Sequence, residues 1–326
     1  MMHPLVVLCV LLAMTFVTPV ESREVAGTWT ASTKEDGSEL LQFSMKTGHD
    51  GNMGNNFDLS VFTGLEWDEI VSADRVPVRF EMRREAGTIE FEGTFRGGHG
   101  AGEYRFVPNP KFPEMLEWLG VPFKPGKDEE RELFQLAIFD VSTEFIRSMQ
   151  RIGYKVSLEQ FVSFRIFNVN PQYVRAMSAK GFDRLSAEKL VETRIHNVTP
   201  EYIQEMRDAG KDLTLDEYVQ SRIFQVTPEF ADEMSRIGYP GLDHDTLVQF
   251  KIHGVSGEFV RDLRELGYTR VPAEQLVAMR IHGVTPEYIR RVADAGYHKV
   301  PVEKLVQMRI FDVDPEMVKA LDERRN

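Results

Sequence analysis

The pattern of hydrophobic and polar residues changes near residue 110. Before that point, apolar residues alternate with mostly polar ones in short segments, as in 76–82, where Val76, Val78, Phe80 and Met82 are the apolar positions. Alternation with a period of two is typical of strands that bury one face. About six such segments, separated by Gly- and Asn-rich turns, predict a small antiparallel β-sandwich or barrel over residues 23–109.

Beyond residue 130, one phrase returns with variations: a basic residue, Ile, His or Phe, a turn, and then Pro-Glu-aromatic. Its clearest copy spans residues 280–288. The isoleucine of this phrase recurs at intervals of 28 or 29 residues, a period typical of stacked supersecondary units. The seven copies contain Ile138, Ile166, Ile195, Ile223, Ile252, Ile281 and Ile310.

Each repeat is expected to contain two short helices. In one copy, Thr199 is placed to cap a helix, Pro200 fits its first turn, and Gly210 supplies a left-handed residue after its end. A second helix begins after a capping residue such as Ser186 and ends just after the isoleucine. Two helices of about ten residues cannot bury their apolar stripes alone, so neighbouring repeats must stack.

The fold class predicted is therefore α+β multidomain. A β-sandwich or barrel at 23–109 is followed by an α-solenoid of seven 28–29-residue helical-hairpin repeats at 131–326. Residues 110–130 form a linker, because prolines at 108, 110 and 113 stop the last strand. Within this linker, Pro113–Gly120 predicts a short helix with Pro in its first turn and Gly at its end.

The first residues differ from the rest of the chain. The run from Leu5 to Val17 is apolar except for Thr15, and small residues follow at Val20 and Ser22, which predicts a signal peptide over 1–22. An uncleaved membrane anchor is the alternative. The single cysteine, Cys9, lies inside this run, so a mature chain would contain no disulfide and no thiolate. We expect a periplasmic or extracellular protein without a stable membrane span after cleavage of the leader.

Charge narrows the class of partner. The formal net charge of −12 at pH 7 argues against nucleic acid, which requires a basic face. One basic column nevertheless runs through the repeats. It has two interpretations: favourable placement in the last turn of a helix, near the acidic residue that starts the next helix, or a face that binds an acidic peptide or polymer. These candidate partner-binding residues are Arg165, Arg194, Arg222, Lys251, Arg280 and Arg309, with Ala137 in the first copy.

A second column contains His196, His253 and His282. Three aligned imidazoles suggest a metal site or acid–base catalysis, but the same position is Phe in the other four copies. A position that accepts Phe four times indicates packing. We therefore predict no metal and no cofactor.

Repeats of the type at 280–288, echoed at 194–202 and 309–317, resemble those of bacterial envelope proteins. Some repeats of this type are similar to the C-terminal extensions of antirepressor metallopeptidases of the beta-lactam-sensor type. The segment 84–98 is similar to the domain that precedes the repeats in these proteins. No His-Glu-x-x-His sequence occurs in this chain, so the resemblance implies an exported accessory or sensor-like module and no protease activity.

Two functions are consistent with these patterns. The first is an exported, non-enzymatic binding or scaffold protein whose repeats engage a protein or peptide, in envelope sensing. The sequence contains no Gly-x-Ser-x-Gly elbow and no pair of residues at metal-ligand spacing, either of which would favour an enzyme. The alternative is a hydrolase or lyase that acts on an envelope polymer, with carboxylates such as Asp58, Glu66 and Asp68 converging in one cleft with raised pKa values.

Overall fold

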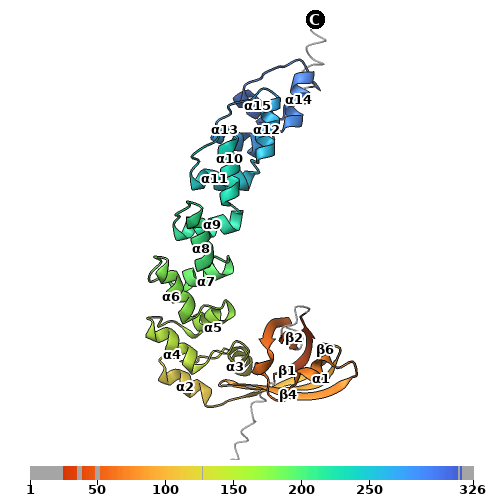
Figure 1. Cartoon of the computed structure of the whole chain (residues 1–326), viewed down its shortest axis with the longest axis vertical. Coiled ribbons are helices and arrows are strands. Elements are labelled where there is room, and N and C mark those ends of the chain that lie inside the picture. The colour runs from red at the N-terminus through yellow and green to blue at the C-terminus, as the bar shows by residue number, and fades with distance from the viewer. Residues whose placement is uncertain (1–24, 35–38, 48–51, 127, 315, 318–326) are drawn as a thin grey trace, which may run out of the picture. The chain divides into compact units, whose positions relative to one another are not determined.

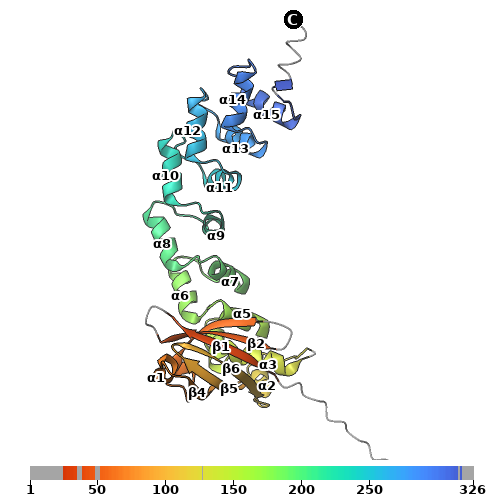
Figure 2. The ribbon, with the colours of Figure 1, turned by 90° about the vertical axis from the view of Figure 1, so that its right-hand side faces the viewer.

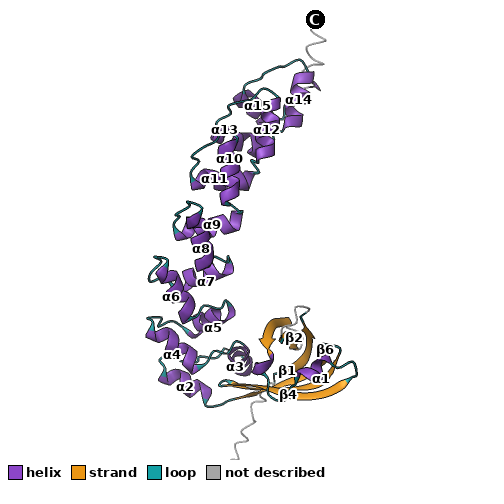
Figure 3. Cartoon of the chain, in the orientation of Figure 1, coloured by secondary structure: helices purple, strands orange, loops and turns teal. Residues whose placement is uncertain are grey.

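The computed structural model describes residues 25–34, 39–47, 52–126, 128–314 and 316–317. The predicted leader at 1–22 lies outside the described residues. The chain divides into two compact units, Met1–Arg165 and Ile166–Asn326. The described part of the first unit contains a β-sheet and several helices, and that of the second contains helices and their connecting turns (Figure 3). The first unit thus extends past the linker predicted at 110–130.

Six strands form one antiparallel sheet, in agreement with the number and type of strands that the alternation predicts (Figure 1). Strands such as β4 bury alternate side chains, here Val78, Phe80 and Met82. The strand order is β3-β2-β1-β6-β5-β4. The strands are β1 (Ala26–Thr33), β2 (Leu40–Thr47), β3 (Asn52–Asp58), β4 (Val76–Arg84), β5 (Gly87–Arg96) and β6 (His99–Pro108).

The sheet coils around its own core. Phe43 of β2 and Phe80 of β4 have ring centroids 6.2 Å apart, although three strands lie between β2 and β4 in the sheet. Four strand spacings in a flat sheet would separate them by about 19 Å. The chain after β3 also reaches β4, because Thr63 and Glu81 exchange backbone hydrogen bonds of 2.8 and 3.0 Å. The sheet therefore curves strongly around its core.

Trp29 occupies the centre of this core, where it is 1% exposed. Its indole N–H donates to the carbonyl oxygens of Glu92 and Glu103, at 3.3 and 3.1 Å. Below the ring, Gly93 of β5 faces Gly102 of β6. A Cβ atom at Gly102 would lie 1.9 Å from the carbonyl oxygen of Glu92, and one at Gly93 would lie 2.7 Å from the Trp29 ring. Gly93 therefore makes room for the indole, and Gly102 allows the backbones of β5 and β6 to approach closely.

Short helices complete the first unit. Helix α3 packs against β5 and β6, and the Phe134 ring of α3 stacks on Tyr104 at 5.6 Å and meets Phe106 at 5.4 Å. The predicted helix at 113–120 is present as α2, which a left-handed Gly120 follows. The helices are η1 (Leu59–Val61), α1 (Trp67–Val71), α2 (Phe112–Trp118), α3 (Glu129–Ile138), α4 (Thr143–Arg151) and α5 (Leu158–Ile166).

The β4–β5 turn also holds the start of α4. Both carboxylate oxygens of Glu85 accept hydrogen bonds from Thr143, one from its backbone N–H at 2.7 Å and one from its hydroxyl at 3.0 Å. A carboxylate at the N-terminus of a helix satisfies donors that have no partner within the helix. The sheet and the first helices of the repeat region therefore pack as one body in this unit.

The second unit contains alternating helices that form two rows (Figure 2). We call α7, α9, α11, α13 and α15 the second helices, because each ends at or beside the repeated isoleucine, and the even-numbered helices the first helices. Contacts join α9 to α11, α11 to α13 and α13 to α15. The helices are α6 (Pro171–Ala179), α7 (Ala187–Ile195), α8 (Pro200–Asp208), α9 (Leu215–Phe224), α10 (Pro228–Arg236), α11 (His244–His253), α12 (Gly257–Glu265), α13 (Ala273–Ile281), α14 (Pro286–Asp294) and α15 (Val302–Ile310).

The predicted helix boundaries are confirmed. The Thr199 hydroxyl accepts the N–H of Tyr202 at 3.2 Å at the start of α8, and Pro200 occupies the first turn. Gly210 follows the helix at φ 76°, a conformation that glycine adopts without strain. The same capping role belongs to Asn170, Thr227, Ser256 and Thr285 at the starts of α6, α10, α12 and α14.

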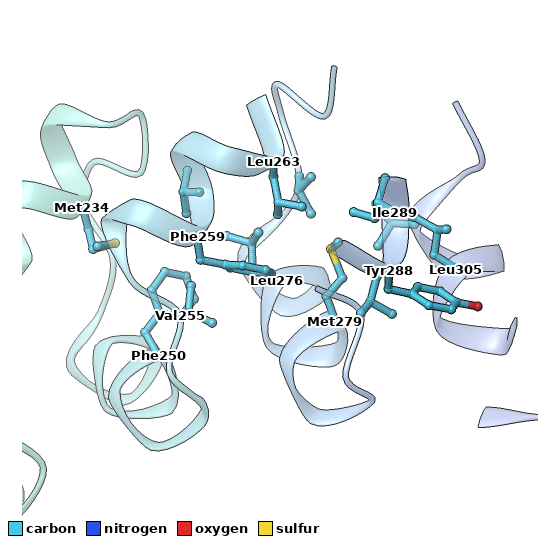
Figure 4. Packing of buried hydrophobic residues seen from close by; sticks show 14 of the residues in the cluster. Met234, Phe250, Val255, Phe259, Leu263, Leu276, Met279, Tyr288, Ile289 and Leu305 are labelled. Carbon is cyan, nitrogen blue, oxygen red and sulfur yellow. The ribbon is translucent and has the colours of Figure 1, made fainter. Parts of the chain in front are cut away.

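Buried apolar residues from both rows of helices form a continuous core in the C-terminal half of this unit. Phe250, Leu276 and Met279 of the second helices pack with Phe259 and Leu263 of a first helix (Figure 4). None of the described helices combines the length and the apolar character that crossing a membrane requires.

We expect Gly102→Ala to lower the free energy of unfolding by about 1–3 kcal/mol or more, because the added methyl group overlaps the carbonyl oxygen of Glu92. Gly54→Ala in β3 is the matched control, because its Cβ would meet the Phe43 carbonyl oxygen at an ordinary 3.8 Å. Urea unfolding, followed by tryptophan fluorescence and circular dichroism, measures both variants. Equal unfolding midpoints for the two variants would contradict this account of the core.

Candidate functional site

Each second helix of the second unit ends in the same tight turn. In α7, Asn197 has a left-handed φ of 53°, and the N–H of buried Val198 donates to the Thr193 carbonyl at 2.7 Å. This six-to-one hydrogen bond with a buried apolar residue just beyond it is a Schellman ending. The same bond joins Val226 to Ser221, Val255 to Phe250, Val284 to Met279 and Val313 to Met308, at 2.8–3.0 Å. We call these turns the exit turns.

The basic column contacts the exit turn of the preceding repeat. The Nε of Arg194 donates to the Phe167 carbonyl at 2.9 Å, and that of Arg165 donates to the Phe139 carbonyl at 2.8 Å. Helix ends leave carbonyl groups without partners inside the helix, so a guanidinium at this place satisfies a free acceptor. Arg280 and Arg309 donate in the same way to the carbonyls of His253 and His282, at 3.1 and 3.3 Å.

The same cations lie over aromatic rings. The Cζ of Arg194 is 4.7 Å from the ring centroid of Tyr173, the aromatic residue that follows the start of the first helix one repeat earlier. Such stacking contributes about 0.5–1 kcal/mol at exposed sites. The other pairs are Arg165 with Phe145, Arg222 with Tyr202, Lys251 with Phe230, Arg280 with Phe259 and Arg309 with Tyr288, at 3.6–5.1 Å.

The acidic residues that start the first helices interact mainly with their own helix starts. Hydrogen bonding there, from backbone N–H groups first and from the capping threonines second, lowers the pKa values of Glu201, Glu229 and Glu287, and the charge of Arg194 lowers that of Glu201 to a smaller extent. Arg165 of the column forms an ion pair with Asp140 at 2.8 Å.

The basic column thus links neighbouring repeats. The cationic group of each member lies over an aromatic ring. Four members also donate a hydrogen bond to a backbone carbonyl. Ala137 occupies this position in the first copy, where α3 packs against the sheet and leaves the side chain fully buried. Binding of an acidic partner by the column stays a prediction, but these contacts give the column a role without one.

A different set of residues on the second helices is exposed and apolar. Ile195 is 52% exposed and Ile281 is 54% exposed. These values are high for a large apolar side chain that recurs at the same position of every repeat. The complete set is Ile166, Ile195, Ile223, Ile252, Ile281 and Ile310, with exposures from 45% to 54%. We call these residues the isoleucine row. In the first copy, by contrast, Ile138 is 3% exposed.

In the sequence these isoleucines mark the period of the repeat and were not predicted to form a surface. A signal was present in the helical spacing. In α7 the buried residues are Ala187, Leu190 and Thr193, three residues apart, whereas Ile195 lies five residues after Leu190. Five residues turn a helix by about 140° from the buried stripe. The repeated isoleucine therefore lies off the face that packs.

The histidine column lies next to this row, at the ends of the second helices. His196 and His253 are partly buried and His282 is exposed. The Nε2 of His253 lies 3.1 Å from the amide oxygen of Gln249, one turn earlier. The described residues include no group of three His, Cys, Asp or Glu side chains arranged to hold a metal ion.

The carboxylates of the enzyme hypothesis cap short helices. Asp58 accepts the backbone N–H of Ser60 at 2.9 Å, and hydrogen bonds from Ser60 lower the pKa of Asp58. Glu66 forms a capping box with Glu69 at the start of α1, where Asp68 is exposed in the first turn. A general acid needs a raised pKa, so the shift at Asp58 has the wrong sign for that role.

One small cavity in the second unit has a packing cause. It has a volume of about 180 Å³ and is lined by Ser221, His244 and Leu247 among others. Ser221 occupies the position that Phe250 and Met279 fill in the next copies, so the smaller side chain leaves space. The Nε2 of His244 is buried there without a hydrogen-bond partner. Burial lowers the pKa of His244, more strongly than the nearby carboxylate of Glu217 raises it.

A comparison of the chain with models of protein families, with curated proteins and with solved structures found no match.

We expect Arg194→Ala to lower the free energy of unfolding by about 1.5–3 kcal/mol, because it removes a charge-assisted hydrogen bond and a ring contact between repeats. Arg194→Lys is the control and should lose less, because Lys251 stacks on Phe230 at the equivalent position. Urea unfolding by circular dichroism measures both. An alanine variant as stable as the parent would show that the column does not link the repeats.

His244 should make the protein sensitive to mild acid. Its folded pKa lies below the usual 6.5, so the unfolded state binds the proton more readily, and stability should fall as pH drops from about 6.5 towards the folded pKa. His244→Leu matches Leu215 one repeat earlier and should remove this component. Urea midpoints at neutral pH and at about pH 5.5 test the sign. An unchanged pH dependence in the variant would contradict it.

Proposed function

We propose that residues 131–326 form an α-solenoid of seven 28–29-residue repeats and act as a non-enzymatic binding module for a protein or peptide. The observation that carries this proposal is the isoleucine row. Six copies of one apolar side chain are about half exposed at the same register. A repeated packing position would be buried, and a repeated solvent-facing position has no reason to be isoleucine.

The surrounding structure supports a binding surface on the second helices. The exit turns fix the backbone next to each isoleucine, and the basic column ties each repeat to its predecessor. Side chains held in this way lose little conformational entropy when a partner covers them. Stacked repeats characteristically bind extended partners along one face.

We place this module in an exported protein of the cell envelope with a role in sensing. The apolar run at 5–17 and the small residues at 20 and 22 support a leader over 1–22. The charge of −12 favours a polypeptide partner over nucleic acid.

Replacing four members of the row should abolish partner capture without unfolding the protein. The variant carries Ile195→Ser, Ile223→Ser, Ile252→Ser and Ile281→Ser. Complete burial of an isoleucine side chain contributes about 1.5–3 kcal/mol, and a partner would cover roughly half of each one, so the loss of four should still reduce capture to background. Affinity capture from an envelope extract, followed by mass spectrometry, provides the measurement.

The matched control changes the same four residues to valine, which keeps a branched apolar surface and should retain the partner. Circular dichroism should show equal helix content and similar unfolding midpoints for both variants, because surface substitutions alter stability by only about 0.5 kcal/mol each. Capture of the same proteins by the serine variant and the parent would refute the proposed function.

A further inference from the structure

The isoleucine row is accompanied by a row of carboxylates on the same helix faces. Seven residues before the exposed isoleucine of each of α7, α9, α11, α13 and α15 stands an acidic residue. About two helical turns separate positions seven apart, which places both residues on one face. All five acidic side chains are exposed. We call Glu188, Asp216, Asp245, Glu274 and Glu303 the acidic row.

The two rows run across neighbouring helices. The Nζ of Lys189 in α7 lies 2.7 Å from Asp216 in α9, and the Gln275 amide in α13 donates to Glu303 in α15 at 2.6 Å. In these two pairs, the starts of neighbouring second helices therefore lie side by side. The five isoleucines lie at the C-terminal ends of the same helices. The surface therefore has a carboxylate edge and an apolar edge.

The helix dipole favours an acid in the first turn of each of these helices. Each member of the acidic row is the second residue of its helix, and the second residue of α3 is likewise acidic, Glu130. In α3 the isoleucine is the tenth helical residue, whereas it is the ninth in α7, and Ile138 is buried. In the second unit the carboxylates therefore lie on the same face as isoleucines that remain exposed.

From this arrangement we infer that the surface binds a polypeptide segment that carries both apolar and basic residues, the basic ones facing the acidic row. The inference rests on the proposed function and specifies the partner of that surface. Charge complementarity selects this occupant. A second copy would bring acidic rows together at a net charge of −12 per chain, and nucleic acids and anionic lipid surfaces would be repelled by the same carboxylates.

The spacing of the rows also specifies the backbone of the partner. Contacts join α9 to α11, α11 to α13 and α13 to α15, and packed helices lie about 8–10 Å apart, so we expect their isoleucines to recur at about that interval. A polyproline II segment rises about 3.1 Å per residue with three residues per turn, so every third side chain returns to the same side at about 9.3 Å. The segment therefore has an apolar residue at every third position and Lys or Arg between, and about fifteen residues span five repeats.

Defined peptides test the inference on the full chain by fluorescence anisotropy. The first peptide has leucine at every third position with lysine and proline between. The second replaces its lysines with glutamate, and the third keeps the composition of the first but groups the leucines at one end. We expect saturable binding of the first peptide, at least about tenfold weaker binding of the other two, and weakening by salt.

Variants of each row supply the specific controls. One variant carries Asp245→Lys, Glu274→Lys and Glu303→Lys together. It should bind the lysine peptide about tenfold or more weakly than the parent does and should bind the glutamate peptide more tightly. Ile252→Ser and Ile281→Ser together should weaken the lysine peptide, whereas the matching valine changes should not. Circular dichroism and the urea midpoint confirm that each variant is folded.

The outcomes separate this inference from the proposed function. Equal binding of the lysine and glutamate peptides, equal binding of the grouped peptide, or no binding of any peptide would overturn the inference. The inference would also be overturned if the serine variant bound the lysine peptide as tightly as the parent does. Each of these results leaves the proposed function standing if capture from the extract depends on the isoleucine row. Capture that is independent of the row removes the proposed function itself.

Discussion

The repeats depend on one interaction, the contact of a basic side chain with the repeat before it. In its complete form, a guanidinium Nε donates to the carbonyl of an exit turn while the cation covers an aromatic ring at the start of a first helix. Short helices are marginal alone, so a bond between successive copies is what orders them. This contact explains why the basic residue, the turn and the Pro-Glu-aromatic start recur together. The three parts belong to one joint between two repeats.

The joint also determines which side chains stay free. In the second unit, the isoleucine that precedes each exit turn faces away from the core, so each of these joints leaves one isoleucine exposed. From the sequence, the basic residue is the expected binding group, but in the structure it contacts the neighbouring repeat. The isoleucine is expected from the sequence to pack in the core, but in the structure it faces solvent. The partner-binding surface that we propose is therefore a by-product of how the repeats are connected.

The first unit shows what happens when polypeptide covers this position. There α3 packs on β5 and β6, Ile138 is buried, and Ala137 replaces the basic residue. The sheet that covers α3 is organised around Trp29, whose indole requires a glycine at position 93. The turn between β4 and β5 further provides Glu85 to cap α4. The sheet thus serves as the support on which the first repeat begins.

The sequence by itself determined the local structure: six strands from alternation, helix starts such as Thr199-Pro200, helix ends such as Gly210, and the period of the repeat. These features depend on residues close together in the chain, where capping and periodicity act directly. The tertiary structure alone decided that the sheet coils so that Phe43 reaches Phe80, that Arg194 pairs with a carbonyl and a ring, and that Ile195 is exposed. Each of these depends on residues at least twenty positions apart, or on which faces remain uncovered after packing, and only the folded chain brings those groups together.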